Sequence, residues 1–178
     1  IVLVTSDRGL CGGFNGNIIA AALRLAREKT AEGLEVSFVC MGKKGRDAVR
    51  SSGFTITKAY ADRMGSIDFA LASSVAQEVI YGYETFALDE VWLIYGEFVS
   101  MGQQPPRNLC LLPLKTPEAE EIAEEAGEPR CEYIYEPQEE KLLAELLPRY
   151  IKVQVYRGML DTSASEHAAR MFAGRSVQ

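Results

Sequence analysis

The sequence contains a single histidine, His167, and four cysteines that lie far apart. Histidine and closely spaced cysteine supply most protein ligands for zinc and related metals, so we expect no metal site. Isolated cysteines are typical of reduced thiols in a cytoplasmic protein rather than of a disulfide framework. No serine, cysteine or aspartate is spaced to act with His167 as a nucleophile or base, so we expect no catalytic residues, and we also expect no cofactor.

Long apolar runs and basic stretches are also missing. No apolar run approaches the roughly 20 residues that a membrane-spanning helix needs, so we expect no direct insertion into a membrane. The net charge of −6 comes from six glutamates between Thr116 and Pro129, and the rest of the chain has equal numbers of acidic and basic residues. That balance leaves no basic stripe for a phosphate backbone and predicts no nucleic-acid partner. The acidic run itself is typical of a solvated loop.

What the sequence does contain is an alternation of strand and helix patterns. Short apolar runs alternate with apolar residues at helical spacing, which predicts an α/β fold with a Rossmann-like, mainly parallel sheet flanked by helices. The loop 100–107 is too short for a crossover helix, so the later strands are expected to form an antiparallel edge. The predicted strands are 1–5, 36–41, 54–58, 91–99, 108–114 and 131–137, and the predicted helices are 14–33, 45–52 and 67–87.

Residues 1–137 are therefore expected to form an α/β domain, and residues 138–178 a helical segment interrupted only at Pro148. Its apolar residues recur at alternating spacings of four and three, the heptad pattern of a coiled coil. No earlier helix matches this seam in length, so we expect its partner helix to come from outside this chain. The seam consists of Leu146, Tyr150, Val153, Arg157, Leu160, Ala164, His167 and Met171.

The last part of this segment offers little apolar area. Without a partner, its small side chains cannot offset an ordering cost of about 1–2 kcal/mol per residue. Serine and threonine at positions 162–165 lower the helix propensity further. We therefore expect residues after about Asp161 to fray, or to become ordered only against a partner. We assign four of them to a subunit interface: Ala164, His167, Ala168 and Met171.

The stretch TSDRGLCGGFNGNI, residues 5–18, places four glycines between the first predicted strand and the first predicted helix: Gly9, Gly12, Gly13 and Gly16. A P-loop needs G-x-x-x-x-G-K-[ST] and a dinucleotide site needs G-x-G-x-x-G, and these glycines have neither spacing. Backbone amides at the helix start could still attract an anion. We favour a structural loop, in which glycine permits a tight turn, over a site for a phosphorylated ligand.

Charged residues follow two of the predicted strands. Lys43, Lys44 and Arg46 come after the second strand, and Asp7 and Arg8 come after the first. Three cations at a helix N-terminus oppose the helix dipole, so a phosphate or an acidic partner would explain them. The ends of parallel strands also often carry active-site groups. For the three cations we favour a solvated surface, and for the neighbouring aspartate and arginine a salt-bridged pair.

The glycine-rich stretch resembles the segment that opens the central domain of the gamma subunit of F-type ATP synthases. Three further blocks resemble that family in the same order: GKKGRD at 42–47, YGEFVSMGQQPP…LLPL at 95–114, and YIYEP…LLPRYIKVQVYRGMLDTSASEHAARM at 133–171. The resemblance covers nearly the whole chain. Its last block is highly specific, because SEHAARM stands in the family at the start of the long C-terminal shaft helix. The residues after Ala173, GRSVQ, depart from the family pattern.

The resemblance implies a non-catalytic central-stalk subunit that couples proton flow through the c-ring to ATP synthesis at the alpha and beta subunits. It also implies that a long N-terminal helix pairs with the C-terminal helix as an antiparallel coiled coil, and that the α/β domain touches the epsilon subunit and the c-ring. The dithiol-bearing insertion of chloroplast relatives is not recognisable. That implies a bacterial member, peripheral on the cytoplasmic face of the inner membrane. The alternative is a small α/β protein that binds a phosphorylated ligand at the Gly9–Gly16 loop.

Overall fold

A five-stranded sheet lies at the centre of the computed structural model, which describes residues 1–114 and 137–175, with side chains described from 144 to 174 in the last helix. The strand order is β3-β2-β1-β4-β5. Strands β1 to β4 are parallel and β5 is antiparallel to β4, which confirms the predicted parallel sheet with an antiparallel edge. The strands are β1 (Val2–Val4), β2 (Ser37–Met41), β3 (Thr55–Tyr60), β4 (Val91–Gly96) and β5 (Pro106–Leu112).

Two predictions fall on the part of the chain that is not described. The acidic run between Thr116 and Pro129 lies outside the described residues. So does the strand predicted over 131–137, apart from Pro137, which begins a helix.

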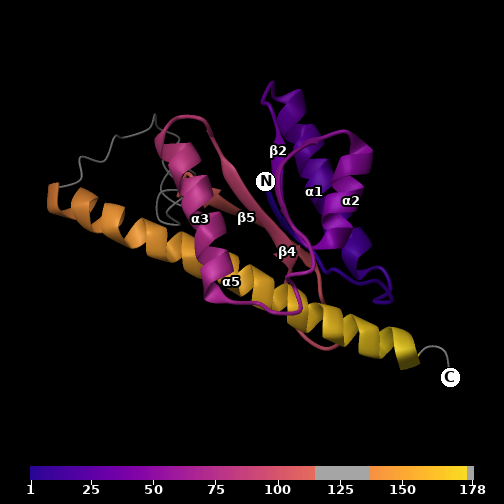
Figure 1. Ribbon diagram of the computed structural model, residues 1–178. Coiled ribbons are helices and arrows are strands. Elements are labelled where there is room, and N and C mark those ends of the chain that lie inside the picture. The colour runs from indigo at the N-terminus through magenta and orange to yellow at the C-terminus, as the bar shows by residue number, and fades with distance from the viewer. Residues whose placement is uncertain (115–136, 176–178) are drawn as a thin grey trace, which may run out of the picture.

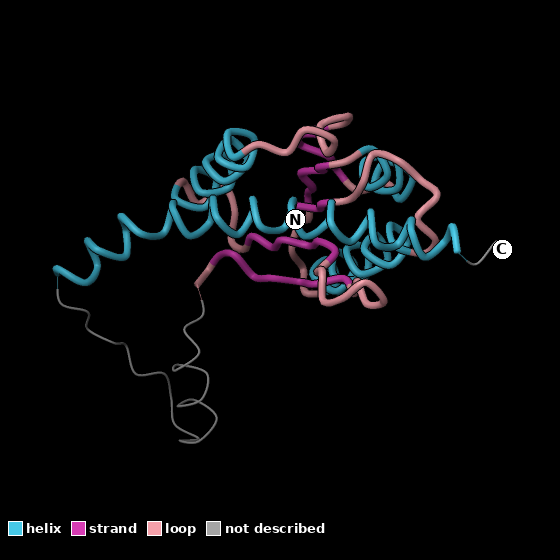
Figure 2. Tube along the Cα trace, turned by 90° about the horizontal axis from the view of Figure 1, so that it is seen from below, coloured by secondary structure: helices cyan, strands magenta, loops and turns pink. Residues whose placement is uncertain are grey.

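Helices cover both faces of the sheet (Figure 1). Because side chains alternate along a strand, the sheet contributes to two cores. Leu3 packs with α1 and α2, whereas Val2 and Val4 pack with α3 and α5. Figure 2 shows α5 running from one end of the molecule to the other. The helices are α1 (Phe14–Ala31), α2 (Lys43–Ser52), α3 (Phe69–Glu84) and α5 (Pro137–Arg175).

Two helices differ from their predicted bounds. Helix α3 starts at Phe69 because the Asp68 carboxylate caps it, accepting a hydrogen bond from the Leu71 amide at 2.7 Å. Helix α3 ends at Glu84, before the predicted end at residue 87, because Phe86 takes a left-handed φ of +59°. Helix α5 continues through Pro148, so the predicted interruption does not divide the C-terminal segment into two helices.

Gly42, outside the glycine-rich stretch, determines how closely α2 approaches β1. Its φ is +102°, and a Cβ atom at this position would lie 2.2 Å from the carbonyl oxygen of Thr5. Its amide donates to the carbonyl of Tyr60 at 3.0 Å, which ties the same turn to β3. Any side chain here would therefore force backbone segments apart.

Replacing Gly42 with alanine should destabilise the fold by about 2–4 kcal/mol, since the added methyl group meets backbone atoms and φ is left-handed. Gly16→Ala is the matched control, because a Cβ at Gly16 in α1 would meet no atom within 4 Å. That control should be neutral or stabilise by up to about 1 kcal/mol through helix propensity. Urea unfolding of both variants measures the difference, and equal stabilities would contradict the close approach of α2 to β1.

Candidate functional site

The glycine-rich loop between β1 and α1 contains one glycine with a conformational requirement. Gly12 has a φ of +57°. A Cβ at Gly9 or Gly13 would make ordinary contacts of 3.6 or 3.7 Å, and a Cβ at Gly16 would meet nothing within 4 Å. The structure therefore gives a backbone reason for glycine at one of the four predicted positions and no steric reason at the other three.

A buried side chain in α1, which the sequence analysis did not single out, holds this loop in place. Asn15 accepts a hydrogen bond from the Ser6 amide through Oδ1 at 3.0 Å. Its Nδ2 donates to the Ser6 hydroxyl at 2.7 Å and to the Arg8 carbonyl at 3.3 Å. The loop is thus pinned back onto its own helix by side-chain amide bonds. The signal in the sequence was only an asparagine in the first turn of a helix, which is common at helix starts for other reasons.

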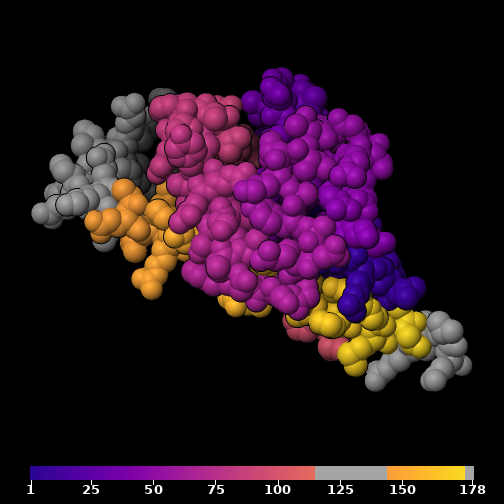
Figure 3. Space-filling view, in the orientation of Figure 1, coloured from indigo at the N-terminus to yellow at the C-terminus, as the bar shows by residue number. Residues whose placement is uncertain are grey.

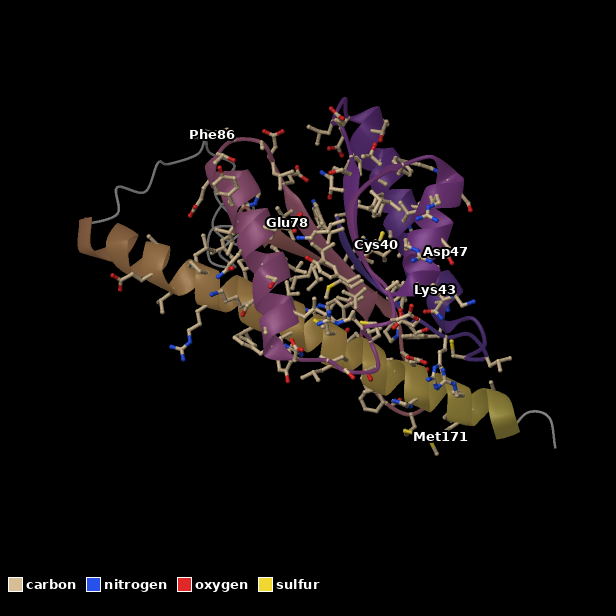
Figure 4. The ribbon with its side chains drawn as sticks, in the orientation of Figure 1. Cys40, Lys43, Asp47, Glu78, Phe86 and Met171 are labelled. Atoms are coloured by element: carbon tan, nitrogen blue, oxygen red, sulfur yellow. The ribbon has the colours of Figure 1, made fainter. Side chains whose placement is uncertain are left out.

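The N-terminus of a helix can bind an anion, but the first-turn amides of α2 are already bonded to the segment that follows β1. The Lys43 amide donates to Asp7 Oδ1 at 2.8 Å (Lys43 is labelled in Figure 4). The Lys44 amide donates to the carbonyl of Ser6 at 3.2 Å. The Gly45 amide donates to Oγ1 of Thr5, also at 2.8 Å. An incoming anion would have to displace three internal acceptors.

Asp7 thus caps the N-terminus of α2 through a backbone amide. The side chains of Lys43 and Lys44 are exposed, as predicted for a solvated surface, and Arg46 pairs with Asp47. The Asp7 carboxylate also accepts from the amides of Asp62 at 2.9 Å and Met64 at 3.0 Å. The prediction of an Asp7–Arg8 ion pair is wrong, because backbone amides from two other segments take up the carboxylate. Asp7 therefore joins the ends of three parallel strands.

The crevice at the switch point of the sheet is filled as well. In open α/β sheets ligands bind where the strand order reverses, here between the ends of β1 and β4. Helix α5 crosses this point: Gly96, the last residue of β4, donates to the Thr162 hydroxyl and accepts from the Ser165 hydroxyl, both at 3.3 Å. Thr162 and Ser165 are fully buried. A helix of the same chain occupies the usual ligand position.

An open hollow of about 600 Å³ remains beside α5. It contains three carboxylates and three strong bases, so it has no net preference for an anion. Two of its charged groups are paired with each other, since Arg170 donates to Glu166. The lining residues are Asp7, Arg8, Lys43, Asp62, Met64, Gly65, Ser163, Glu166, His167 and Arg170.

Helix α5 has two faces of different character. Its 39 residues span about 58 Å at 1.5 Å per residue. One face packs on α3 and β4 and includes Ile151, Val155 and Met159, which are fully buried. Burial also raises the pKa of the half-buried Asp161 carboxyl above its usual value, while Arg157 opposes that shift. The docked face therefore belongs to the core of the α/β body.

The other face carries the predicted heptad seam, and the seam is exposed along the whole described part of the helix. The exposed fraction of its large apolar side chains ranges from 37% for Tyr150 to 56% for Met171. Met171 points away from the sheet (Figure 4). In the space-filling view α5 runs along the lower edge of the body (Figure 3). This long apolar stripe, opposite a docked face, is the candidate functional surface.

The four predicted interface residues divide between the two faces. Ala164, His167 and Met171 are exposed on the seam, but Ala168 is 2% exposed and packs inside this chain. The expectation of fraying after Asp161 did not take into account the bonds that this part of α5 makes to the body. Thr162 and Ser165 are buried and hydrogen-bonded, and Arg170 donates to the Gly9 carbonyl at 3.4 Å. The body thus holds α5 as far as its last turns.

Comparison with known protein families gives a match over almost the whole chain. A family model described as ATP synthase matches residues 1–176. The ATP synthase gamma chain of Nitratidesulfovibrio vulgaris strain Hildenborough is 61% identical over 173 residues, which cover 97% of this chain and 58% of the relative. The ATP synthase gamma chain of Maridesulfovibrio salexigens is 56% identical over 173 residues, which cover 97% and 59%. The chain thus spans well under two thirds of the length of these relatives.

Solved structures show the same architecture. A chain of the central stalk and c-ring of Tetrahymena thermophila mitochondrial ATP synthase gives a TM-score of 0.67 at 25% identity, over 99% of this chain and 76% of that chain. A rotor chain of Euglena gracilis mitochondrial ATP synthase gives a TM-score of 0.67 at 20% identity, over 99% and 65%, and shows the fold alone. None of the helices in the described part of the chain combines the length and apolar character needed to cross a bilayer.

Replacing Asp7 with alanine should destabilise the fold by about 1–3 kcal/mol, because the amides of Lys43, Asp62 and Met64 lose their acceptor. Arg8→Ala changes the charge at the neighbouring exposed position and should leave stability within about 0.5 kcal/mol of the parent. Chemical denaturation of both variants provides the measurement. A destabilisation of Arg8→Ala as large as that of Asp7→Ala would mean that an ion pair, not amide capping, holds these strand ends.

Proposed function

The chain belongs to the family of ATP synthase gamma chains, and we propose that it acts in the central stalk of an F-type ATP synthase. In this proposal it is a rotor subunit without catalytic residues of its own. It couples proton flow through the c-ring to ATP synthesis at the alpha and beta subunits. The observation that carries the proposal is the exposed apolar seam of α5.

The seam is suited to a second helix. A stripe with heptad spacing remains exposed while the opposite face of the same helix is buried in the body. Exposed apolar stripes of this length mark interaction surfaces, and heptad spacing selects a helix as the partner. We propose that a helix pairs with α5 as an antiparallel coiled coil, and that this pair forms the shaft inside the alpha and beta subunits. Arg157 and His167 interrupt the apolar stripe.

The filled strand ends support a mechanical rather than a catalytic role. The α2 amides are bonded to Thr5, Ser6 and Asp7, and α5 crosses the switch-point crevice at Gly96. A phosphorylated ligand at the N-terminus of α2 would have to displace these acceptors, and a ligand at the switch-point crevice would have to displace α5. In a rotor the same interactions stiffen the body and bond α5 to it.

The remaining partners and the location follow from the same family. We propose that the α/β body contacts the epsilon subunit and the c-ring, and that the chain lies peripherally on the cytoplasmic face of the bacterial inner membrane as part of the synthase. The similarity to a chain of the central stalk and c-ring of Tetrahymena thermophila mitochondrial ATP synthase supports a position next to a c-ring.

The chain should not bind Mg·ATP or Mg·ADP at physiological concentrations. Its glycine-rich loop lacks the lysine and the hydroxyl of a P-loop. Isothermal titration calorimetry on the purified protein is the measurement. Low-micromolar affinity for either nucleotide would favour the ligand-binding alternative.

A charge in the seam should prevent assembly. Leu160→Glu would place an unpaired carboxylate inside the proposed coiled coil, at a cost of several kcal/mol, and we expect roughly tenfold less chain to co-purify with the alpha and beta subunits. Gln154→Glu, which lies on the flank of the same helix, adds the same charge away from the seam and should assemble like the parent. Normal assembly and normal ATP-driven proton pumping of Leu160→Glu would refute the proposed role of the seam.

A further inference from the structure

Two hydroxyl side chains of α5 bond to the end of a strand instead of to their own helix. The usual bond of a helical hydroxyl runs one turn back, as Thr30 shows by donating to the carbonyl of Ala26 at 2.8 Å. In α5 the Thr162 hydroxyl accepts from the Gly96 amide, and the Ser165 hydroxyl donates to the Gly96 carbonyl, both at 3.3 Å. Both polar groups of one strand residue are thus bonded to α5.

The sheet cannot supply these partners. The Glu97 amide donates to the Pro105 carbonyl on the β5 side at 2.9 Å. Because the backbone groups of successive strand residues point to opposite sides, those of Gly96 point away from β5, toward β1. On that side the pairing of β1 with β4 ends with Leu3 opposite Ile94. The Gly96 amide and carbonyl lie past the last pair of β1 and β4, so α5 supplies the hydrogen-bond partners that β1 does not.

Gly96 is also fixed from the other face of the sheet. A Cβ there would lie 2.4 Å from Cε2 of Phe14 and 3.0 Å from Cδ1 of Ile18, both in α1. One turn before Thr162, a Cβ at Gly158 of α5 would lie 3.2 Å from Cδ2 of Leu93. The end of β4 is therefore held between α1 and α5, with glycine on both sides of the contact between α5 and the strand.

We propose that Thr162, Ser165 and Gly96 form a clasp that fixes the angle and the axial position of α5 on the α/β body, and so transmits torque between them. Apolar packing is non-directional, so a helix held by packing alone can turn or slide between neighbouring positions. Hydrogen bonds are directional, and two bonds to the amide and carbonyl of one residue permit one register. This inference rests on the proposed rotor function and assigns the residues that connect body to shaft.

A second tie lies two turns farther along α5. Arg170 donates to the Gly9 carbonyl at 3.4 Å, and its guanidinium also bonds to Glu166. The carboxylate orients the arginine toward the loop after β1, while the clasp holds the end of β4. Two separated attachment points resist rotation of α5 about its own axis better than either point alone.

The test uses an ATP synthase assembled with a gamma chain that contains this sequence, reconstituted in vesicles. The double variant Thr162→Val, Ser165→Ala removes both hydroxyls and nearly conserves volume. Ser163→Ala, adjacent on the same helix and without a bond to Gly96, is the matched control, and Thr162→Ser is the conservative variant that keeps a hydroxyl. Protons pumped per ATP hydrolysed is the main readout, because a general loss of stability lowers both rates together and leaves their ratio unchanged.

We expect the double variant to hydrolyse ATP and to pump about half as many protons per ATP or fewer, since each lost bond shifts the register equilibrium by roughly fivefold. Exchange of the Gly96 amide hydrogen with solvent should accelerate roughly fivefold. Ser163→Ala and Thr162→Ser should keep the parent ratio. A parent ratio in the double variant, or in the single variants Thr162→Val and Ser165→Ala if the double variant fails to assemble, overturns the clasp. Proton pumping by complexes that lack the chain would instead overturn the proposed function.

Discussion

Parallel strands end in backbone amides and carbonyls that the sheet itself leaves without partners, and a buried group of this kind has to find one. In enzymes of this architecture a ligand often provides it. Here the chain does so itself: Asp7 accepts from three amides at the ends of neighbouring segments, and Thr162 and Ser165 satisfy Gly96. The closed strand ends, the position of α2 and the path of α5 all depend on this internal satisfaction.

The same arrangement explains why α5 can serve two purposes. Its inner face completes a core that already includes α3 and the sheet, so packing within the chain holds the helix on the body. Its outer face is then free to carry an apolar seam for a second helix. The polar residues that lower helix propensity, Thr162 and Ser165, are the ones that bond across to the sheet. At these positions the side chains lower the intrinsic stability of the helix but strengthen its attachment to the sheet.

Periodicity was sufficient to predict the succession of strands and helices along the chain and the heptad seam, because each depends on spacing within one segment. The antiparallel edge at β5 was predicted from the short loop 100–107, which leaves no room for a crossover helix. Periodicity failed where the reason for a residue lies on another segment. The glycine-rich stretch drew attention by its density, yet the glycines whose added Cβ would come closest to neighbouring atoms are Gly42 and Gly96, which lie outside that stretch. For the same reason Asn15 was missed and Ala168 was wrongly assigned to the exposed seam. Both are buried by a distant element, which leaves no local pattern in the sequence.

The contact of Gly96 with α1 on one side and α5 on the other also bears on how this sequence can change over time. Phe14 and Thr162 lie on opposite faces of the sheet, but both meet the same glycine. A larger residue at position 96 would need a smaller one at 14 and would also disturb the bonds to α5. Substitutions at these three positions are therefore expected to be strongly epistatic, and lineages should inherit them as a set rather than exchange them one by one.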